Sequence, residues 1–191
     1  RCFLDTIFIP KDIQELRREM LESGIDPILY GQSGAKSLEN LFTEIQAGEC
    51  HLAWMGYSNI LYRVVEVICM DICCDGWRLV EVEQRFRGGG KRLRSLDTSV
   101  AEKMKPGETQ EEAVARLVKE EVSTFISGCQ PVPVYKKSAE EQKISKSYPG
   151  LMTRYLFHNY DWFLVGVNTF GSPVVEEPDK TVVYKWVPTP N

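Results

Sequence analysis

The stretch that best decides the fold is residues 107–121, which read GETQEEAVARLVKEE. Thr109, followed three residues later by Glu112, forms a capping box, and the glutamates of the first turn suit the positive end of a helix dipole. Apolar residues then recur with a period near 3.6, and Gly128 supplies a stop signal. The stretch therefore predicts an amphipathic helix that begins at Thr109 and packs one face against a core.

Two carboxylates interrupt this apolar face. At about 100° per residue, Glu121 falls inside the apolar stripe and Glu120 lies at its margin. An ionised carboxylate is seldom buried without a partner, because its desolvation costs several kcal/mol. A divalent metal, an arginine or exposure at the mouth of a site would each compensate for this cost. A surface helix with a poorly covered edge is the simpler alternative, and periodicity leaves both open.

The same residues resemble the signature of the Nudix hydrolase family: a glycine, five residues, a glutamate, seven residues, then Arg-Glu-hydrophobic-any-Glu-Glu-any-Gly. Glu108 matches the first glutamate, Arg116 matches the arginine, and Glu120 with Glu121 matches the pair. The resemblance implies that Glu120 and Glu121 bind Mg²⁺ or Mn²⁺ at a diphosphate, while Glu108 and Arg116 brace the loop. Hard cations of this kind take oxygen ligands and neutralise charge in phosphoryl chemistry.

Four positions depart from the signature. Glu102 occupies the position of the leading glycine, and Ala101 precedes it. Ser123 occupies the position of the terminal glycine, and Leu117 occupies that of the glutamate after the arginine. Leu117 removes a carboxylate one helical turn from the pair. Loss of an anionic ligand weakens a magnesium or manganese site, and loss of a group that activates water lowers turnover. Glu102 is the candidate to replace the missing carboxylate.

Strand-like segments surround the helix. They lie at residues 60–73, 77–86, 151–157, 162–167 and 181–187. Asp75-Gly76 is a hairpin signal, and a turn is expected at residues 159–161. The last strand is similar to the tryptophan-bearing last strand of many Nudix domains, and residues 96–100 resemble the branch that includes isopentenyl-diphosphate-isomerase-like proteins.

Together the segments and the resemblance predict an α+β fold. We expect a Nudix-like mixed β-sheet in an α/β/α sandwich over residues 55–191, with the Thr109 helix on one face. Residues 12–22 and 37–47 carry apolar side chains at helical spacing and predict two further helices. We expect residues 1–54 to form a helical extension on this domain. Covering the substrate, forming a homodimer and completing the core are the three roles open to it.

A basic stretch, residues 85–94, counters the acidic average of the chain. It is not a phosphate-binding P-loop, because Lys91 is followed by Arg92 rather than by serine or threonine. One interpretation is a solvated hairpin tip. The other is a lip that binds the phosphates of a ligand through its cationic side chains, which are Arg87, Lys91, Arg92 and Arg94.

Three further features are candidates. Glu176 and Glu177 precede the last strand, where some family members place an extra carboxylate that binds metal or activates water. His158 has a titration range suited to acid–base chemistry, although a structural histidine is the simpler interpretation. Residues 138–147 are polar and predict a long loop.

Composition excludes several classes of protein. The net charge of −4 at pH 7 argues against nucleic acid as the main partner. No run approaches the roughly eighteen apolar residues of a membrane span. Six cysteines without a C-x-x-C motif predict free thiols in the cytoplasm or another reducing compartment. Organelle targeting stays open because the chain begins at Arg1.

Two functions remain in contention. The first is a Mg²⁺- or Mn²⁺-dependent pyrophosphohydrolase that cleaves a nucleoside diphosphate linked to another moiety, with a carboxylate outside the helix, such as Glu102, Glu176 or Glu177, activating water. The second is a Nudix-fold module that has lost hydrolysis and binds a small diphosphate or nucleotide ligand for regulation, which Leu117 favours. An isomerase-like diphosphate enzyme is a third interpretation.

Overall fold

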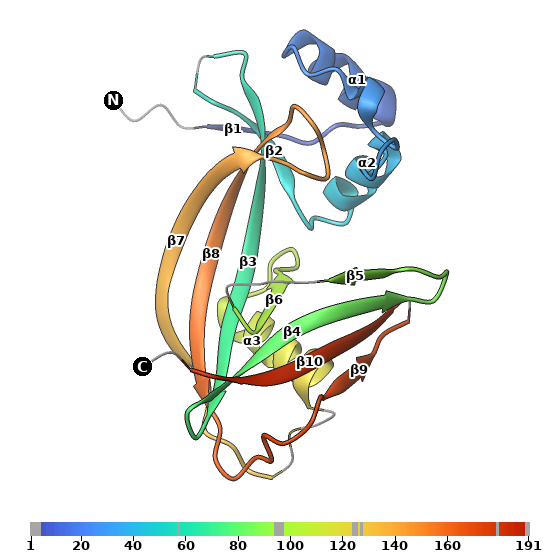
Figure 1. Ribbon diagram of the computed structural model, residues 1–191. Coiled ribbons are helices and arrows are strands. Elements are labelled where there is room, and N and C mark those ends of the chain that lie inside the picture. The colour runs from blue at the N-terminus through green and yellow to red at the C-terminus, as the bar shows by residue number, and fades with distance from the viewer. Residues whose placement is uncertain are drawn as a thin grey trace. The chain divides into compact units, whose positions relative to one another are not determined.

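Figure 1 shows the computed structural model of the chain, which describes residues 5–56, 58–93, 98–123, 126, 128–178 and 180–189. It is a mixed α+β structure with three α-helices in the described part and a sheet whose strands pair mainly antiparallel. The chain divides into two compact units. The first holds residues 1–67, 103–107 and 139–157, and the second holds residues 68–102, 108–138 and 158–191. The expected division at residue 54 stays a prediction.

The helices of the first unit confirm the two predicted near the N-terminus. They are α1 (Ile13–Glu22), whose first turn is capped by Asp12, and α2 (Leu38–Gln46), which starts with a capping box at Ser37. A short 3₁₀ turn, η1 (Pro27–Leu29), lies between them. The apolar faces of both helices enter one core, in which the buried side chains include Leu16, Met20, Leu41, Ile45, Leu52 and Tyr148.

Two short strands of this unit were not predicted. They are β1 (Thr6–Phe8) and β2 (His51–Trp54), which pair antiparallel with each other. β2 also pairs with the first residues of β3 (Leu61–Cys74). Segments of three or four residues are too short to show a period of two, so neighbouring strands rather than local pattern determine them.

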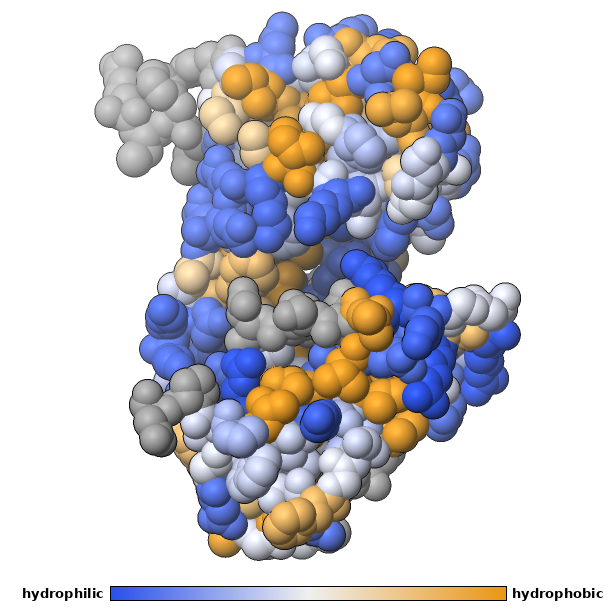
Figure 2. All heavy atoms as spheres, in the orientation of Figure 1, coloured by the Kyte–Doolittle hydropathy of each residue, from blue (hydrophilic) through white to orange (hydrophobic). Residues whose placement is uncertain are grey.

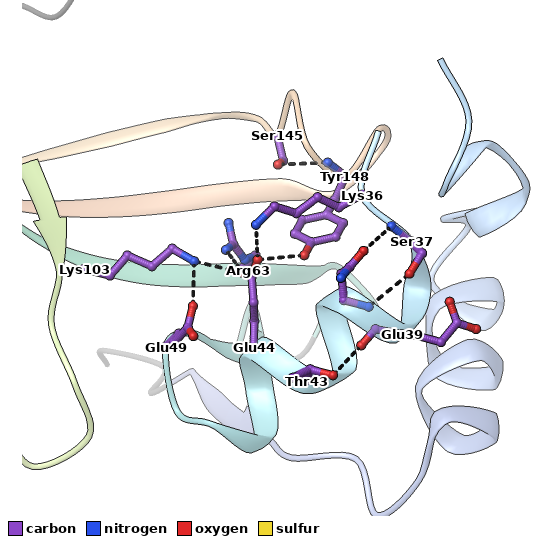
Figure 3. Close-up of polar contacts among 11 residues, drawn as sticks. Lys36, Ser37, Glu39, Thr43, Glu44, Glu49, Arg63, Lys103, Ser145 and Tyr148 are labelled. Carbon is purple, nitrogen blue, oxygen red and sulfur yellow. Dashed lines mark hydrogen bonds and ion pairs between the residues drawn. The ribbon is translucent and has the colours of Figure 1, made fainter. Parts of the chain in front are cut away.

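A charged cluster ties α2 to β3 and to three other segments of the first unit (Figure 3). The carboxylate of Glu44 is buried, with 6% of the residue exposed, and it accepts hydrogen bonds from four groups, Lys36, Arg63, Lys103 and Tyr148. Burial alone would raise the pKa of Glu44. The hydrogen bond from Lys36 and the charges of Arg63 and Lys103 outweigh burial and lower that pKa to about 2.

The sheet of the second unit is built on the hairpin predicted at Asp75-Gly76. β4 (Trp77–Phe86) pairs with the end of β3, with β5 (Lys91–Leu93) and with β10 (Lys180–Pro188). β10 also pairs with β9 (Val174–Glu176), and β6 (Val100–Lys103) pairs with β3. The helix α3 (Gln110–Leu117) and the π-helical turn η2 (Val118–Val122) complete this unit (Figure 1).

Two sequence-based expectations on β7 (Val134–Ile144) and β8 (Met152–Phe163) were wrong. The predicted polar loop at residues 138–147 largely belongs to β7, and the turn predicted at residues 159–161 lies inside β8. The side chains of β7 are exposed along its whole length, so no apolar alternation marks it as a strand. Pairing with β8 forms it instead.

The polar residues that suggested a turn in β8 make contacts with β7. Asn159 Nδ2 donates to the Lys137 carbonyl at 3.3 Å, and Lys136 Nζ lies 3.3 Å from Asp161 Oδ1. His158 Nδ1 lies 2.8 Å from the Ser138 hydroxyl. These side chains therefore serve cross-strand contacts in the second unit.

Part of the basic stretch and part of the branch resemblance fall on residues that the structure does not describe. Arg94 of the basic stretch and residues 96–97 of the branch resemblance lie outside the described residues. The cysteines in the described part are free thiols, and Cys50, Cys69 and Cys74 are buried. In the described part of the chain, no helix has the length and apolarity that a membrane crossing requires.

Candidate functional site

The start of α3 confirms the predicted capping box. The Thr109 hydroxyl accepts a hydrogen bond from the Glu112 backbone, and the Glu112 carboxylate accepts one from the Thr109 backbone. Further along, the guanidinium of Arg116 forms a forked ion pair with Glu108, with Nε–Oε1 at 2.8 Å and Nη2–Oε2 at 3.0 Å. Two parallel hydrogen bonds fix both position and orientation, so this pair holds residues 108–116 in one conformation.

The helix is regular only as far as Leu117. The Ser123 N–H then bonds to the Val118 carbonyl at 2.9 Å, which is the spacing of a π-helix. Leu117 and Val122 are both 0% exposed. Five residues apart on an α-helix, they would point about 140° away from each other. The wider π turn explains why both reach the core, and residues 120 and 121 are part of it.

The π turn sends the paired glutamates to different surroundings. The side chain of Glu120 is 54% exposed and lies 3.5 Å from Nη1 of Arg116. The carboxylate of Glu121 turns toward β10, where its Oε2 accepts a hydrogen bond from the Tyr184 hydroxyl at 3.0 Å. Of the two, only Glu121 is among the residues that line the cavity described next.

A cavity of about 100 Å³ lies beside Glu121 in the second unit. Its lining residues come from β4, β6, η2, β10 and the turn after β9. Among the described residues, four carboxylates and one ammonium group line it, from Glu81, Glu102, Glu121, Glu177 and Lys180. The remaining lining residues are Gln84, Val100, Ala101, Val182 and Tyr184. Three of the predicted site residues, Glu102, Glu121 and Glu177, therefore share one cavity.

A β-bulge shapes the wall formed by β4. The register between β4 and β10 shifts between Val183 and Tyr184, which leaves Val82 as an extra residue. Side chains three apart on a regular strand point to opposite faces. The extra residue brings Glu81 and Gln84 to the same face, and bulges re-aim side chains in this way beside functional sites.

The described lining of the cavity carries more negative than positive charge. Burial raises the pKa of Glu121, and the charge of Glu177 raises it further against the hydrogen bond from Tyr184. Burial also raises the pKa of Glu102, which the charge of Arg116 opposes. The pKa of the Tyr184 hydroxyl rises as well, through burial and then through the charge of Glu121. Each shift reflects a desolvated acid among other acids.

Two side chains of the cavity have polar atoms without hydrogen-bond partners among the described residues. Glu177 Oε2 pairs with Lys180 Nζ at 2.9 Å, whereas its Oε1 is buried without a hydrogen-bond partner among the described residues. Gln84 is 9% exposed, and within the same part of the chain no residue donates to or accepts from its amide. Both groups therefore retain bonding capacity toward a ligand.

The donor set suits a hard cation such as Mg²⁺ or Mn²⁺, because carboxylate and amide oxygens are the ligands that these ions prefer. As the side chains lie, no three His, Cys, Asp or Glu residues of the described ranges are arranged to hold a metal ion. The ion pair of Glu177 with Lys180 and the hydrogen bond of Glu121 with Tyr184 occupy oxygens that would serve as ligands.

The other predicted site residues lie away from the cavity lining. Glu176 is exposed and its Oε2 accepts a hydrogen bond from the Thr181 hydroxyl at 2.8 Å. Arg87 is exposed in the turn of the β4–β5 hairpin, and Lys91 pairs with Glu83 at 3.4 Å. Arg92 lies directly opposite Gln84 across the two strands. Partners in this position point to one face of a sheet, so Arg92 lies on the side of β4 that Gln84 faces.

Sequence reasoning missed Glu81, Gln84, Lys180 and Tyr184. A signal for Glu81 was present, because it follows the buried Leu79 by two residues and so occupies an inward position of β4. The bulge that aims Gln84 has no comparable local signal.

Comparison with known proteins adds no family. The chain matches no protein-family model, and no curated protein matches it. The resemblance to Nudix hydrolases therefore rests on residues 101–123 and the strands around them.

Proposed function

We propose that the chain is a Nudix-like pyrophosphohydrolase with a reduced metal site, which uses Mg²⁺ or Mn²⁺ to cleave a nucleoside diphosphate linked to another moiety. In this proposal the second unit has a Nudix-like arrangement of sheet and helix. The substrate class comes from the resemblance of residues 101–123. The cavity beside Glu121 is the site.

One observation carries the proposal. Glu102, Glu121 and Glu177 are far apart in the sequence and were selected from it as site residues, and they line a single cavity. The forked pair of Arg116 with Glu108 supports it, because it fixes the loop that precedes the helix. Partly buried carboxylates with raised pKa values are also more common at functional sites than elsewhere.

The charge of the cavity explains why a cation is required. Four carboxylates against one ammonium group would repel a diphosphate. Glu102, Glu121 and Glu177 would hold the ion, and when bound it neutralises phosphate charge and lowers the pKa of water. Glu177 has a buried oxygen without a hydrogen-bond partner among the described residues, which supports this role.

The size of the cavity limits what enters it. About 100 Å³ holds an ion and a few oxygen atoms, whereas whole ligands occupy pockets of roughly 300–1,000 Å³. The nucleoside would therefore lie outside the cavity. Among the described cations of the basic stretch, Arg92 is well placed to contact its phosphates, because it faces the same side of the sheet as Gln84.

A ligand-binding module without hydrolysis is the second candidate. Leu117 is 0% exposed and belongs to the core, so this position has no room for a ligand group. Glu120 lies beside Arg116 and solvent rather than in the cavity. A site with fewer carboxylates binds a metal more weakly and activates water less, which favours binding over turnover.

Metal-dependent release of phosphate or nucleotide from a panel of diphosphate-linked compounds tests the proposal. We expect Glu121→Gln to lower the rate by about 100-fold or more, because it removes a charge from the cavity. Glu120→Gln is the matched control on the adjacent, exposed residue, and we expect less than about a ten-fold loss.

Absence of turnover by the folded wild-type protein with either metal would overturn the hydrolase. Binding of the same compounds, measured by calorimetry with and without Mg²⁺, would then support the module. Equal losses in the two variants would show that the glutamates act as a pair despite their different surroundings.

A further inference from the structure

We propose that Glu81 of β4 is a further ligand of the divalent cation and takes the place of the carboxylate that Leu117 lacks. This inference rests on the proposed function, because it assumes that the cavity holds Mg²⁺ or Mn²⁺. It assigns a carboxylate ligand beyond Glu102, Glu121 and Glu177 to a strand rather than to the helix.

The helix cannot supply this ligand. Leu117 is completely buried in the core, as is Val122. The side chain of Glu120 is more than half exposed and lies beside Arg116. A magnesium ion is usually bound through one or two carboxylates, with waters and substrate phosphates as its other ligands, and each further carboxylate adds charge to the site. The missing group must therefore come from another wall of the cavity.

Glu81 has the required position. It lies directly opposite Tyr184 in the register of β4 and β10. Directly opposed residues have Cβ atoms about 4.5–5.5 Å apart on one face of a sheet. The hydroxyl of Tyr184 in turn reaches Glu121 at 3.0 Å. Tyr184 thus lies between the two acids, and the charge of Glu81 contributes to the raised pKa of this hydroxyl.

Glu81 is more deeply buried than Glu102, which the sequence suggested as the replacement for the missing helix carboxylate. Glu81 is 7% exposed and lines the cavity through the bulge at Val82. The side chain of Glu102 is 38% exposed and has Arg116 at 3.7 Å. A carboxylate as buried as Glu81 gains most from an adjacent cation, because desolvation strengthens the attraction.

Two groups of the cavity have bonding capacity that a bound ion would use, and one of them is not an acid. Gln84, on the same wall as Glu81, is nine-tenths buried and has an amide without a hydrogen-bond partner in the part of the chain described. Oε1 of Glu177 is also buried without a hydrogen-bond partner among the described residues. Both supply oxygen atoms of the type that a hard cation binds.

Calorimetric titration of the full chain with MnCl₂ alone tests the assignment without any need for turnover. We expect Glu81→Gln to weaken Mn²⁺ binding by about ten-fold or more, because site affinity depends on the number of charged ligands. Glu83→Gln is the matched control, since Glu83 lies on the same strand, pairs with Arg85 and Lys91 and is absent from the cavity lining. We expect it to change affinity by less than about two-fold.

The outcomes separate this inference from the proposed function. Wild-type binding with an unchanged affinity in Glu81→Gln would overturn the role of Glu81 and leave the proposed function standing. No Mn²⁺ binding by the wild-type protein at millimolar concentration would overturn both. If Glu81→Gln does not fold, Glu81→Asp keeps the charge and retracts the carboxylate by one methylene, and wild-type affinity in that variant would also overturn the assignment.

Discussion

Glu44 in the first unit and Glu121 in the second are both removed from bulk water, and their surroundings are opposite. Three cations and a tyrosine hydroxyl contact Glu44, and its pKa falls to about 2 (Figure 3). Glu121 shares a cavity with three other carboxylates and one ammonium group, and its pKa rises. Cations surround the first acid and lower its pKa, whereas burial among other carboxylates raises the pKa of the second.

The face of the molecule that Figure 2 shows gives no such contrast in hydropathy. In Figure 2 hydrophilic and hydrophobic residues are interspersed over the visible face of both units. Surface hydropathy is a poor guide to function, because much of any protein surface is apolar. The distinction between the two clusters depends on which charges are buried together, and the following experiments test it.

The largest effect is expected from Glu44→Gln. Arg63 is 4% exposed and would lose the carboxylate that compensates its charge. Removing one partner of a buried ion pair costs about 3–5 kcal/mol, and urea unfolding would measure the loss. Glu49→Gln is the control, because Glu49 is an exposed partner of Lys103, and it should cost less than about 1 kcal/mol. Equal losses would remove the distinction between buried and exposed pairs.

The pH dependence of stability is the second test. The folded pKa of Glu44, about 2, lies below its ordinary value of 4.5, so its contribution is complete above pH 4.5 and is lost as the pH falls toward 2. A difference of this size corresponds to roughly 3 kcal/mol. Unfolding free energies measured from pH 7 to pH 2 should therefore fall more steeply for the wild type than for Glu44→Gln. Parallel curves would contradict the lowered pKa.

A smaller effect is expected from the tyrosine of the same cluster. The Tyr148 hydroxyl donates to Glu44 at 2.9 Å, and a buried hydrogen bond to a charged group contributes about 1.5–3 kcal/mol. Tyr148→Phe should lower the unfolding free energy by this amount. Tyr30→Phe is a close control, because the Tyr30 ring lies 5.6 Å from the Tyr148 ring and its buried hydroxyl has no partner among residues of the described ranges. We expect it to be neutral within about 0.5 kcal/mol.

The smallest effect on stability is expected at Glu121. Its folded pKa is raised, so its ionisation penalises the fold above pH 4.5 and the penalty disappears below that value. Glu121→Gln should raise the unfolding free energy at pH 7 by less than about 1 kcal/mol in metal-free buffer and leave it unchanged near pH 4. Destabilisation by several kcal/mol at pH 7 would show that Glu121 is a structural acid like Glu44.

Sequence patterns predicted the parts of the site that lie on the α3 helix and in its loop. The capping box at Thr109 follows from side chains three residues apart, and the inward position of Glu121 follows from helical periodicity. The same periodicity could not show that the π turn separates Glu120 from Glu121. That separation depends on the burial of both Leu117 and Val122 in the core. The residues of a single helical turn do not predict this burial.

By itself the sequence determined where the helices begin and where most of the paired strands of the second unit lie, because capping, turn chemistry and periodicity act over a few residues. Tertiary structure alone decided that β7 is a strand, that Val82 is a bulge and that Glu81 joins Glu121 and Glu177 at one cavity. Each of these depends on pairing between segments distant in the chain. Such pairing is set by the register of a neighbouring strand and leaves little trace in local composition.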